Sequence, residues 1–171
     1  MILRDFRSDD ADDVNRVALA AFEQYRDSYA DWPAMAAGIG RMSSLAEHGE
    51  LIVAERDGHL VGAIAYIAPD GPKAAFFDPA WPVIRMLVVD PAARGHGVGR
   101  ALTEACIARA RRDRSPVIAL HTSPVMTVAL PLYLRMGFVL LRAAPPIHGV
   151  PYGIYLKHLD AHPARDASVG S

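Results

Sequence analysis

The chain has 171 residues, of which 51% are hydrophobic and 22% are charged, and its formal net charge is -1. A chain of this length is expected to form one domain with a sizeable core, and the composition excludes a disordered protein. The near-neutral charge argues against nucleic acid as a partner, because non-specific binding to nucleic acid needs a strongly basic surface.

The single cysteine, Cys106, excludes an intramolecular disulfide and fits a reducing cytoplasm. It lies among alanine, leucine and isoleucine, which predicts a small buried hydrophobe rather than a nucleophile. The first residues show no apolar signal segment, and no apolar run approaches the roughly 20 residues that cross a bilayer. We therefore expect a cytoplasmic protein with no membrane partner.

Apolar residues at helical spacing predict helices, and alternating or continuous apolar runs predict strands. In chain order, the predicted elements are a strand over 2–6, a helix capped by Ser8 and reaching Tyr25, a helix from Pro33, strands over 51–55 and 60–66, a loop over 68–82, a strand over 83–89, a helix over 98–112, a strand over 117–121, a helix over 125–136, and strands over 138–142 and 154–159.

Prolines decide two of the predictions in the second half of the chain. Pro131 lies inside the predicted helix 125–136 and should bend that helix or shift its start. The stretch AAPPIHGVP, residues 143–151, is predicted to be a loop because of its prolines and glycine. Residues 160–171 show no pattern, and we expect them to form a disordered tail.

This order of elements predicts an α/β fold of the α+β type. We expect a single mixed central sheet of about six to seven strands, flanked by about four helices, with the domain spanning residues 1–159. The strand–helix–strand passage over 83–121 should be a right-handed parallel crossover.

Four arginines cluster at the end of the predicted helix 98–112, namely Arg109, Arg111, Arg112 and Arg114. Cations at a helix C-terminus complement its dipole. We therefore interpret the cluster as a solvated helix end rather than as a patch for nucleic acid.

The stretch DPAARGHGVGRAL, residues 90–102, places three glycines between a predicted strand and a predicted helix. A helix N-terminus offers unpaired N–H groups and a positive dipole end, and glycines let these groups converge on a phosphate. Arg94 adds a positive charge, although the glycines alone also fit an ordinary turn. The spacing excludes a dinucleotide fingerprint, because position 100 is arginine, and a Walker loop, because Gly-Lys-Ser/Thr is absent.

Two motifs resemble the GNAT superfamily of acyl-CoA-dependent N-acyltransferases. VVDPAARGHGVGRAL resembles its pyrophosphate loop, Gln/Arg-x-x-Gly-x-Gly/Ala, and ALPLYLRMGF resembles its later helix, which ends in Leu-Tyr-x-x-x-Gly-Phe. The matching residues are Arg94, Gly97 and Gly99 in the first motif and Leu132, Tyr133, Gly137 and Phe138 in the second. The predicted order of elements also follows the family over residues 1–159.

The resemblance implies acetyl-CoA as the co-substrate. The glycine loop would hold the pyrophosphate, and the preceding strand would lie along the pantetheine arm and point an N–H at the thioester carbonyl. The residues expected to bind acetyl-CoA are Leu87, Val88, Val89, Arg94, Gly95, His96, Gly97, Val98, Gly99 and Arg100. An exposed loop position is an equal alternative for His96.

For catalysis, the resemblance implies that Tyr133 is the general acid that protonates the leaving thiolate, and the alternative is an aromatic core residue. The chain departs from the family at two positions. Met126 stands where an asparagine is frequent, and Val83 stands where some members carry a glutamate base. Deprotonation of the amine is therefore left either to His121 or to a water relay.

A second set of residues is expected to form the acceptor site. Its walls are the first helices with Tyr25, Tyr29 and Trp32, the loop with Phe76, Phe77 and Trp81, and the segment 148–152. The resemblance implies N-acetylation of a primary amine. Because these walls are aromatic and contain few acids, we expect the acceptor to be a small molecule. A protein or peptide amine, a non-catalytic acyl-CoA-binding module and an interaction domain remain alternatives, and a homodimer is possible.

The histidines do not predict a metal site. His158 and His162 have the spacing of helical metal ligands, but they straddle a strand end and a proline-containing tail. We therefore expect no metal to be bound.

Overall fold

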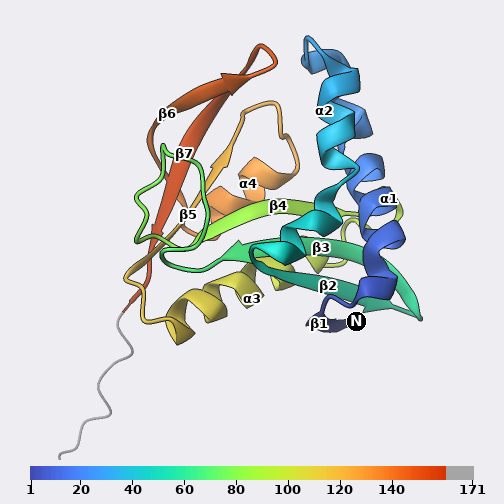
Figure 1. Ribbon diagram of the computed structural model, residues 1–171, viewed down its shortest axis with the longest axis horizontal. Coiled ribbons are helices and arrows are strands. Elements are labelled where there is room, and N and C mark those ends of the chain that lie inside the picture. Colours follow the sequence, from blue (N-terminus) through green and yellow to red (C-terminus); the bar gives the residue numbers. More distant parts are fainter. Residues whose placement is uncertain (161–171) are drawn as a thin grey trace, which may run out of the picture.

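The computed structural model describes residues 1–160, and a single seven-stranded sheet forms its centre (Figure 1). The strands are β1 (Ile2–Asp5), β2 (Glu50–Arg56), β3 (His59–Ile67), β4 (Val83–Val89), β5 (Val117–Thr122), β6 (Val139–Ile147) and β7 (Val150–His158). The α-helices are α1 (Ala11–Phe22), α2 (Trp32–Ile39), α3 (Val98–Arg112) and α4 (Ala129–Arg135). Short 3-10 helices occupy Ser8–Asp10, Glu23–Ser28, Met42–Glu47 and Pro91–Ala93.

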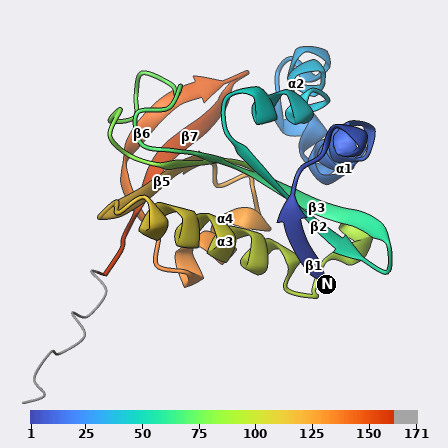
Figure 2. The same cartoon turned by 60° about the horizontal axis from the view of Figure 1, so that its bottom comes forward.

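The strand order is β1-β2-β3-β4-β5-β7-β6. Every neighbouring pair is antiparallel except β4 and β5, which are parallel and are connected through α3. In Figure 2, α1 and α2 lie on one side of the sheet and α3 lies on the other. The predicted single mixed sheet with flanking helices is confirmed.

Each face of the sheet has its own core. On one face, Leu102 and Cys106 of α3 pack with Ile64, Ile118 and other buried residues of the central strands. On the other face, Val14 and Val17 of α1 pack against the opposite side of β2 and β3. Cys106 is fully buried, as predicted, and burial raises the pKa of its thiol.

The start of the first helix differs from the prediction. Ser8 begins a 3-10 turn instead of capping an α-helix, and α1 starts at Ala11. The reason is that the Asp10 carboxylate accepts hydrogen bonds from the Arg7 backbone N–H, at 2.8 Å, and from the Arg4 guanidinium, at 2.7 Å. These bonds fix the turn before the helix. By contrast, Pro33 lies in the first turn of α2, close to its predicted position.

Prolines explain the two differences in the second half of the chain. The predicted helix 125–136 is reduced to α4, which begins at Ala129, so that Pro131 falls in the first turn, where a missing N–H costs nothing. The predicted loop 143–151 is wrong, because β6 and β7 continue through it to a tight turn at His148 and Gly149. β6 is an edge strand and has an irregular register there, which tolerates proline.

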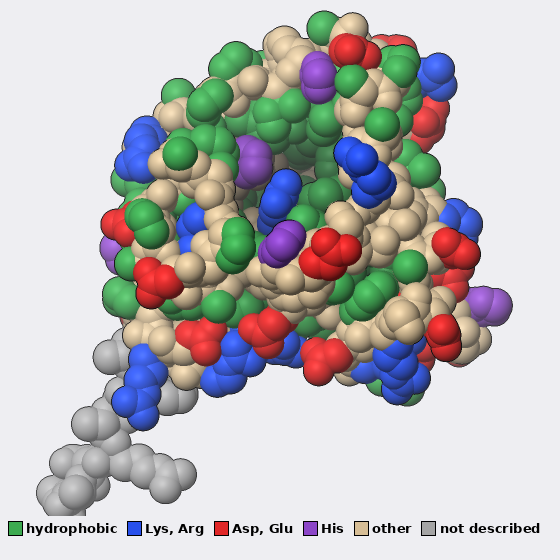
Figure 3. All heavy atoms as spheres, viewed as in Figure 1, with side chains coloured by type: hydrophobic (Ala, Val, Ile, Leu, Met, Phe, Trp, Pro, Cys, Tyr) green, Lys and Arg blue, Asp and Glu red, His purple; other side chains and the backbone are tan. Residues whose placement is uncertain are grey.

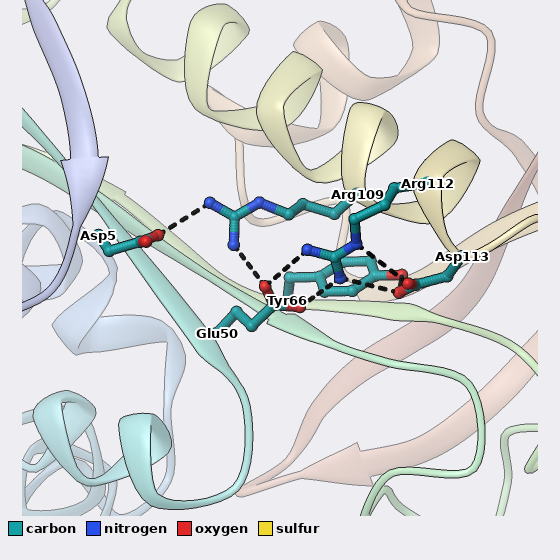
Figure 4. A network of polar contacts seen from close by, with 6 residues as sticks. All are labelled: Asp5, Glu50, Tyr66, Arg109, Arg112 and Asp113. Carbon is teal, nitrogen blue, oxygen red and sulfur yellow. Dashed lines mark hydrogen bonds and ion pairs between the residues drawn. The ribbon is translucent and has the colours of Figure 1, made fainter.

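The sequence suggested that the arginine cluster at the C-terminus of α3 is solvated, but in the structure two of its arginines form ion pairs. Arg112 donates to the Glu50 carboxylate at 2.8 Å, and Arg109 donates to Asp5 at 2.9 Å (Figure 4). Arg112 also pairs with Asp113 at 3.1 Å. The network therefore links the end of α3 to β1 and β2.

We expect Glu50→Gln to lower the free energy of unfolding by about 1 kcal/mol at pH 7, in the upper range for exposed ion pairs. The hydrogen bond from Arg112 lowers the pKa of Glu50 below its ordinary value of 4.5. The stabilisation is therefore present above pH 4.5 and is lost as the pH falls through the lowered pKa. Urea unfolding of the wild type and the variant, at pH 7 and again well below pH 4.5, measures this difference in stability. Glu23→Gln, in the exposed pair with Arg26, is the control. An unchanged difference at low pH would contradict this account.

No helix within residues 1–160 is long and apolar enough to cross a membrane. The predicted disordered tail, apart from its first residue, and His162 lie outside the described residues.

Candidate active site

A cleft of about 750 Å³ lies where β4 and β5, the two parallel strands, separate. Its walls come from α1 and α2, from β4 and β5, from the loop that precedes α3, from α4, and from the turn between β6 and β7. Figure 3 shows a hollow in this face with hydrophobic, basic and histidine side chains around it. Among the described residues, no aspartate or glutamate lines the cleft.

The cleft exists because β4 and β5 diverge. Their register holds a single pair, Val83 with Ala119. Beyond this pair, β4 contains an irregularity in which Met86 is left out of the pairing with β3 and adopts a φ of 55°. A bulge bends its strand and leaves the backbone of the extra residue unpaired. The segment that follows, including Leu87 and Val89, lines the cleft.

The glycine loop builds the N-terminus of α3. Gly97 is the N-cap residue with a φ of 76°, and Gly95 has a φ of 80°, a conformation that favours glycine. The first intrahelical bond runs from the Ala101 N–H to the Gly97 carbonyl at 3.0 Å. Among the residues that the structure describes, no side chain caps the helix, so the N–H groups of its first turn remain available for an anion.

Gly99 has a different role in the loop. A Cβ atom at this position would lie 3.2 Å from the Leu132 side chain and 3.6 Å from that of Leu87. At Gly95 and Gly97, in contrast, a Cβ atom would meet nothing within 4 Å. Gly99 therefore allows α3 and α4 to pack closely, and the other two glycines shape the backbone.

Eight of the ten predicted cofactor residues line the cleft. The two that do not are Val88, which is buried against α1, and His96, whose Nδ1 lies 3.2 Å from the Ala93 carbonyl oxygen. The side chain of Val98 is buried in the core on the α3 face, so only its backbone can serve a ligand. Arg94 is held in place by a hydrogen bond of 3.4 Å to the Ala21 carbonyl at the end of α1.

Tyr133 lies on α4, lines the cleft and is only 5% exposed. Its ring packs edge-to-face on Phe138 with centroids 5.6 Å apart, which fixes its position. Burial raises the pKa of its hydroxyl, so the phenol keeps its proton at neutral pH. The side chain can therefore act as a proton donor in this pH range.

His121 lies near the end of β5, as predicted, and faces the cleft. Its ring packs against Phe76, Phe77 and Tyr152 with centroid distances of 5.2, 5.8 and 5.3 Å. Burial, together with the positive charge of Arg85, lowers the pKa of His121 to about 4. The imidazole is therefore neutral at pH 7.

The predicted acceptor wall is assembled in part. Tyr25, His148 and Tyr152 line the cleft, and the hydroxyl of Tyr29 hydrogen-bonds to that of Tyr152 behind them. The Ala30 N–H donates to the His148 carbonyl at 2.8 Å, which joins the segment after α1 to the β6–β7 turn. These contacts close one end of the cleft.

The loop aromatics lie elsewhere than predicted. Phe76 and Phe77 stack behind His121 instead of lining the cleft. Trp81 lies against the Arg142 guanidinium, 5.9 Å from the ring centroid. The loop therefore supports the site from outside.

Sequence reasoning missed two basic residues of the cleft, Arg85 on β4 and Arg135 at the end of α4. Arg85 interrupts the apolar run VIRMLVV, and a charged residue inside such a strand was a signal that could have identified it. The structure also shows where the two residues lie at which the chain departs from the family pattern, Val83 and Met126. Val83 is buried outside the cleft, and Met126 lines it.

The comparisons of this chain with known proteins all point to acetyltransferases. The model of the acetyltransferase (GNAT) family matches residues 11–138. A mycothiol acetyltransferase of Cellulomonas flavigena is 33% identical over 129 residues, which cover 70% of this chain and 37% of that protein. An S-alkylcysteine N-acetyltransferase of Bacillus subtilis is 29% identical over 120 residues, or 67% of this chain and 65% of that protein.

Among solved structures, a GCN5-related N-acetyltransferase from Rhodopseudomonas palustris is similar in fold. Its TM-score is 0.73 at 21% identity, and the match covers 92% of this chain and 95% of that chain. The chain spans little more than a third of the mycothiol acetyltransferase that it matches. The family predicted from the glycine loop and from the motif around Tyr133 is confirmed, and the chain belongs to the GNAT acetyltransferase family.

Proposed function

We propose that the chain transfers the acetyl group of acetyl-CoA to the primary amine of a small molecule. One observation carries this proposal: a single cleft contains both the uncapped N-terminus of α3 and the Tyr133 side chain. The helix N-terminus suits the diphosphate at one end of acetyl-CoA, and the buried proton donor suits the sulfur that leaves at the thioester end. The names of the two relatives, which refer to mycothiol and S-alkylcysteine, support a small acceptor.

The residues of the cleft fit acetyl-CoA in two ways. Gly95 and Gly97 leave open space above an N–H-rich helix end, where a diphosphate can approach the backbone. Arg94, Arg100 and Arg135 line the cleft and supply positive charge for phosphates. When bound, acetyl-CoA supplies an activated acyl group as a thioester.

The residues from Leu87 to Val89 would hold the pantetheine arm along β4, beyond the bulge at Met86. A backbone N–H of this segment would stabilise the negative charge that develops on the thioester carbonyl oxygen. The strand is buried at Val88 and held in the sheet, so this donor is fixed before the reaction begins.

In the transfer, the amine nitrogen forms a C–N bond to the acetyl carbon as the C–S bond breaks. Tyr133 donates its proton to the departing sulfur and regains one from solvent. The amine loses a proton to a water relay, since a neutral His121 with a pKa of about 4 is a weak base.

The pH dependence of turnover distinguishes the two bases. We expect the acid limb of kcat/KM to follow the pKa of the acceptor amine and to move when a less basic amine is used, because only the neutral amine attacks. The His121→Gln variant should keep this limb. If the limb instead stays at one pH for every amine and disappears in the variant, His121 is the base.

The proposed function is tested by screening an amine library for release of free thiol from acetyl-CoA. We expect turnover with small primary amines and little with peptides or polyamines, because the Ala30–His148 contact partly closes the cleft and none of its lining residues within 1–160 is a carboxylate. Acetyl-CoA binding without turnover would instead identify a binding module. Turnover confined to peptides would contradict the small-molecule acceptor.

A further inference from the structure

Arg85 differs from the other arginines of the cleft by its position on β4, near the point where β4 and β5 separate. Arg94, Arg100 and Arg135 belong to the glycine loop, to α3 and to α4, on the side proposed for acetyl-CoA. Arg94 bonds to a carbonyl and Arg100 pairs with Glu104 at 3.0 Å. None of the ion pairs within residues 1–160 includes Arg85 or Arg135, and of these two only Arg85 lies on β4.

The strand register places Arg85 next to His121. Val83 on β4 pairs with Ala119 on the parallel strand β5. Arg85 lies two positions after Val83, and His121 lies two positions after Ala119. Alternate residues of a strand point to the same face. Arg85 and His121 therefore stand side by side where the strands begin to separate, and the positive charge of Arg85 contributes to lowering the pKa of His121.

Both side chains lie on the face of the sheet opposite α3. Their neighbours Ile84 and Leu120 are buried in the core on the α3 face, together with Tyr133. Arg85 and His121 therefore belong to the opposite face, the one that carries α1 and α2. An acceptor that enters the cleft from this face would meet Arg85.

We propose that Arg85 binds a carboxylate of the acceptor, and that the acceptor is an amino-acid derivative whose carboxylate is free. A guanidinium binds a carboxylate through two parallel hydrogen bonds. Within residues 1–160, no acidic side chain lines the cleft that could compete for it or hold an ammonium group. The same cation disfavours protonation of a nearby amine, which keeps the amine reactive. This inference rests on the proposed function and names the substrate class of the same site.

The test compares L-amino acids with their carboxamides as acceptors, using S-methyl-L-cysteine, L-methionine and L-phenylalanine. The pH-independent kcat/KM is used, because the paired amines differ in pKa. We expect the wild type to prefer the acids by about 10-fold or more, as for a charge-assisted bidentate pair. Arg85→Gln should abolish this preference mainly through KM, and Arg85→Lys should retain part of it.

Arg26→Gln is the matched control, because it removes the same charge from a surface pair outside the cleft and should keep the preference. Affinity for acetyl-CoA should be unchanged in every variant, which shows that the fold is intact. Equal turnover of acids and carboxamides, or an unchanged ratio in Arg85→Gln, overturns the carboxylate assignment and leaves acetyl transfer standing. No thiol release with any member of either series or of the amine library overturns both.

Discussion

Replacing Gly97 by valine is expected to weaken acetyl-CoA binding by about 100-fold or more. Gly97 caps α3 with a φ of 76°, and its Cα faces open space at the proposed phosphate site. A β-branched side chain there disfavours this φ and obstructs the approach of a phosphate to the N–H groups of the helix end. Losing two charge-assisted hydrogen bonds, at about 1.5 kcal/mol each, corresponds to this factor.

The control for this variant is Gly58→Val. Gly58 has a φ of 77° in the β2–β3 turn, and a Cβ atom there also meets nothing within 4 Å. The two variants should lose similar stability, of order 1–3 kcal/mol, from backbone strain. Calorimetry with acetyl-CoA then separates them, because only Gly97→Val should lose binding. Equal affinity in both folded variants would show that the glycines form only a turn.

The second large effect is expected for Tyr133→Phe, which should lower kcat by about 10²- to 10⁴-fold, the range for a positioned proton donor. Acetyl-CoA affinity should change little, because the variant keeps the ring and its packing on Phe138. Burial raises the pKa of the hydroxyl, so the loss should be constant between pH 6 and pH 9. Initial rates of thiol release at saturating acetyl-CoA measure it.

Tyr155→Phe serves as the control for this measurement. Tyr155 is buried in the same core as Tyr133 but does not line the cleft, so its variant should keep full activity. If Tyr133→Phe also turns over at the wild-type rate, the hydroxyl is not the acid, and the thiolate leaves unaided or takes its proton from water.

The sequence was sufficient to predict the sheet and the helix that follows the glycine loop, because both depend on local patterns. α3 begins at Val98 and ends at Arg112, as its apolar spacing indicated. The extension of β6 and β7 through residues 143–151 was not predictable in the same way. Its strand geometry is imposed by pairing across the hairpin, which outweighs the local preference of two prolines at a sheet edge.

The residues that line the cleft were predictable where they stand in a sequence motif, and not where contacts between distant parts of the chain bring them together. The glycine loop and Tyr133 stand in recognisable motifs, and both line the cleft. The bulge at Met86 has no local signal, because a methionine with positive φ is held only by the surrounding sheet. The Tyr29–Tyr152 hydrogen bond joins residues far apart in the chain, so no pattern near either residue could indicate it.

The most direct test of the central claim follows the acetyl group itself. The chain is incubated with acetyl-CoA that carries an isotopically labelled acetyl group and with the acceptor that turns over fastest, and the products are analysed by mass spectrometry. We expect one labelled acetyl group on the nitrogen of the acceptor for each thiol released, at a rate that falls by about 10²-fold or more in Tyr133→Phe. Thiol release without a labelled acceptor, or with the label only on the chain or in acetate, would contradict it.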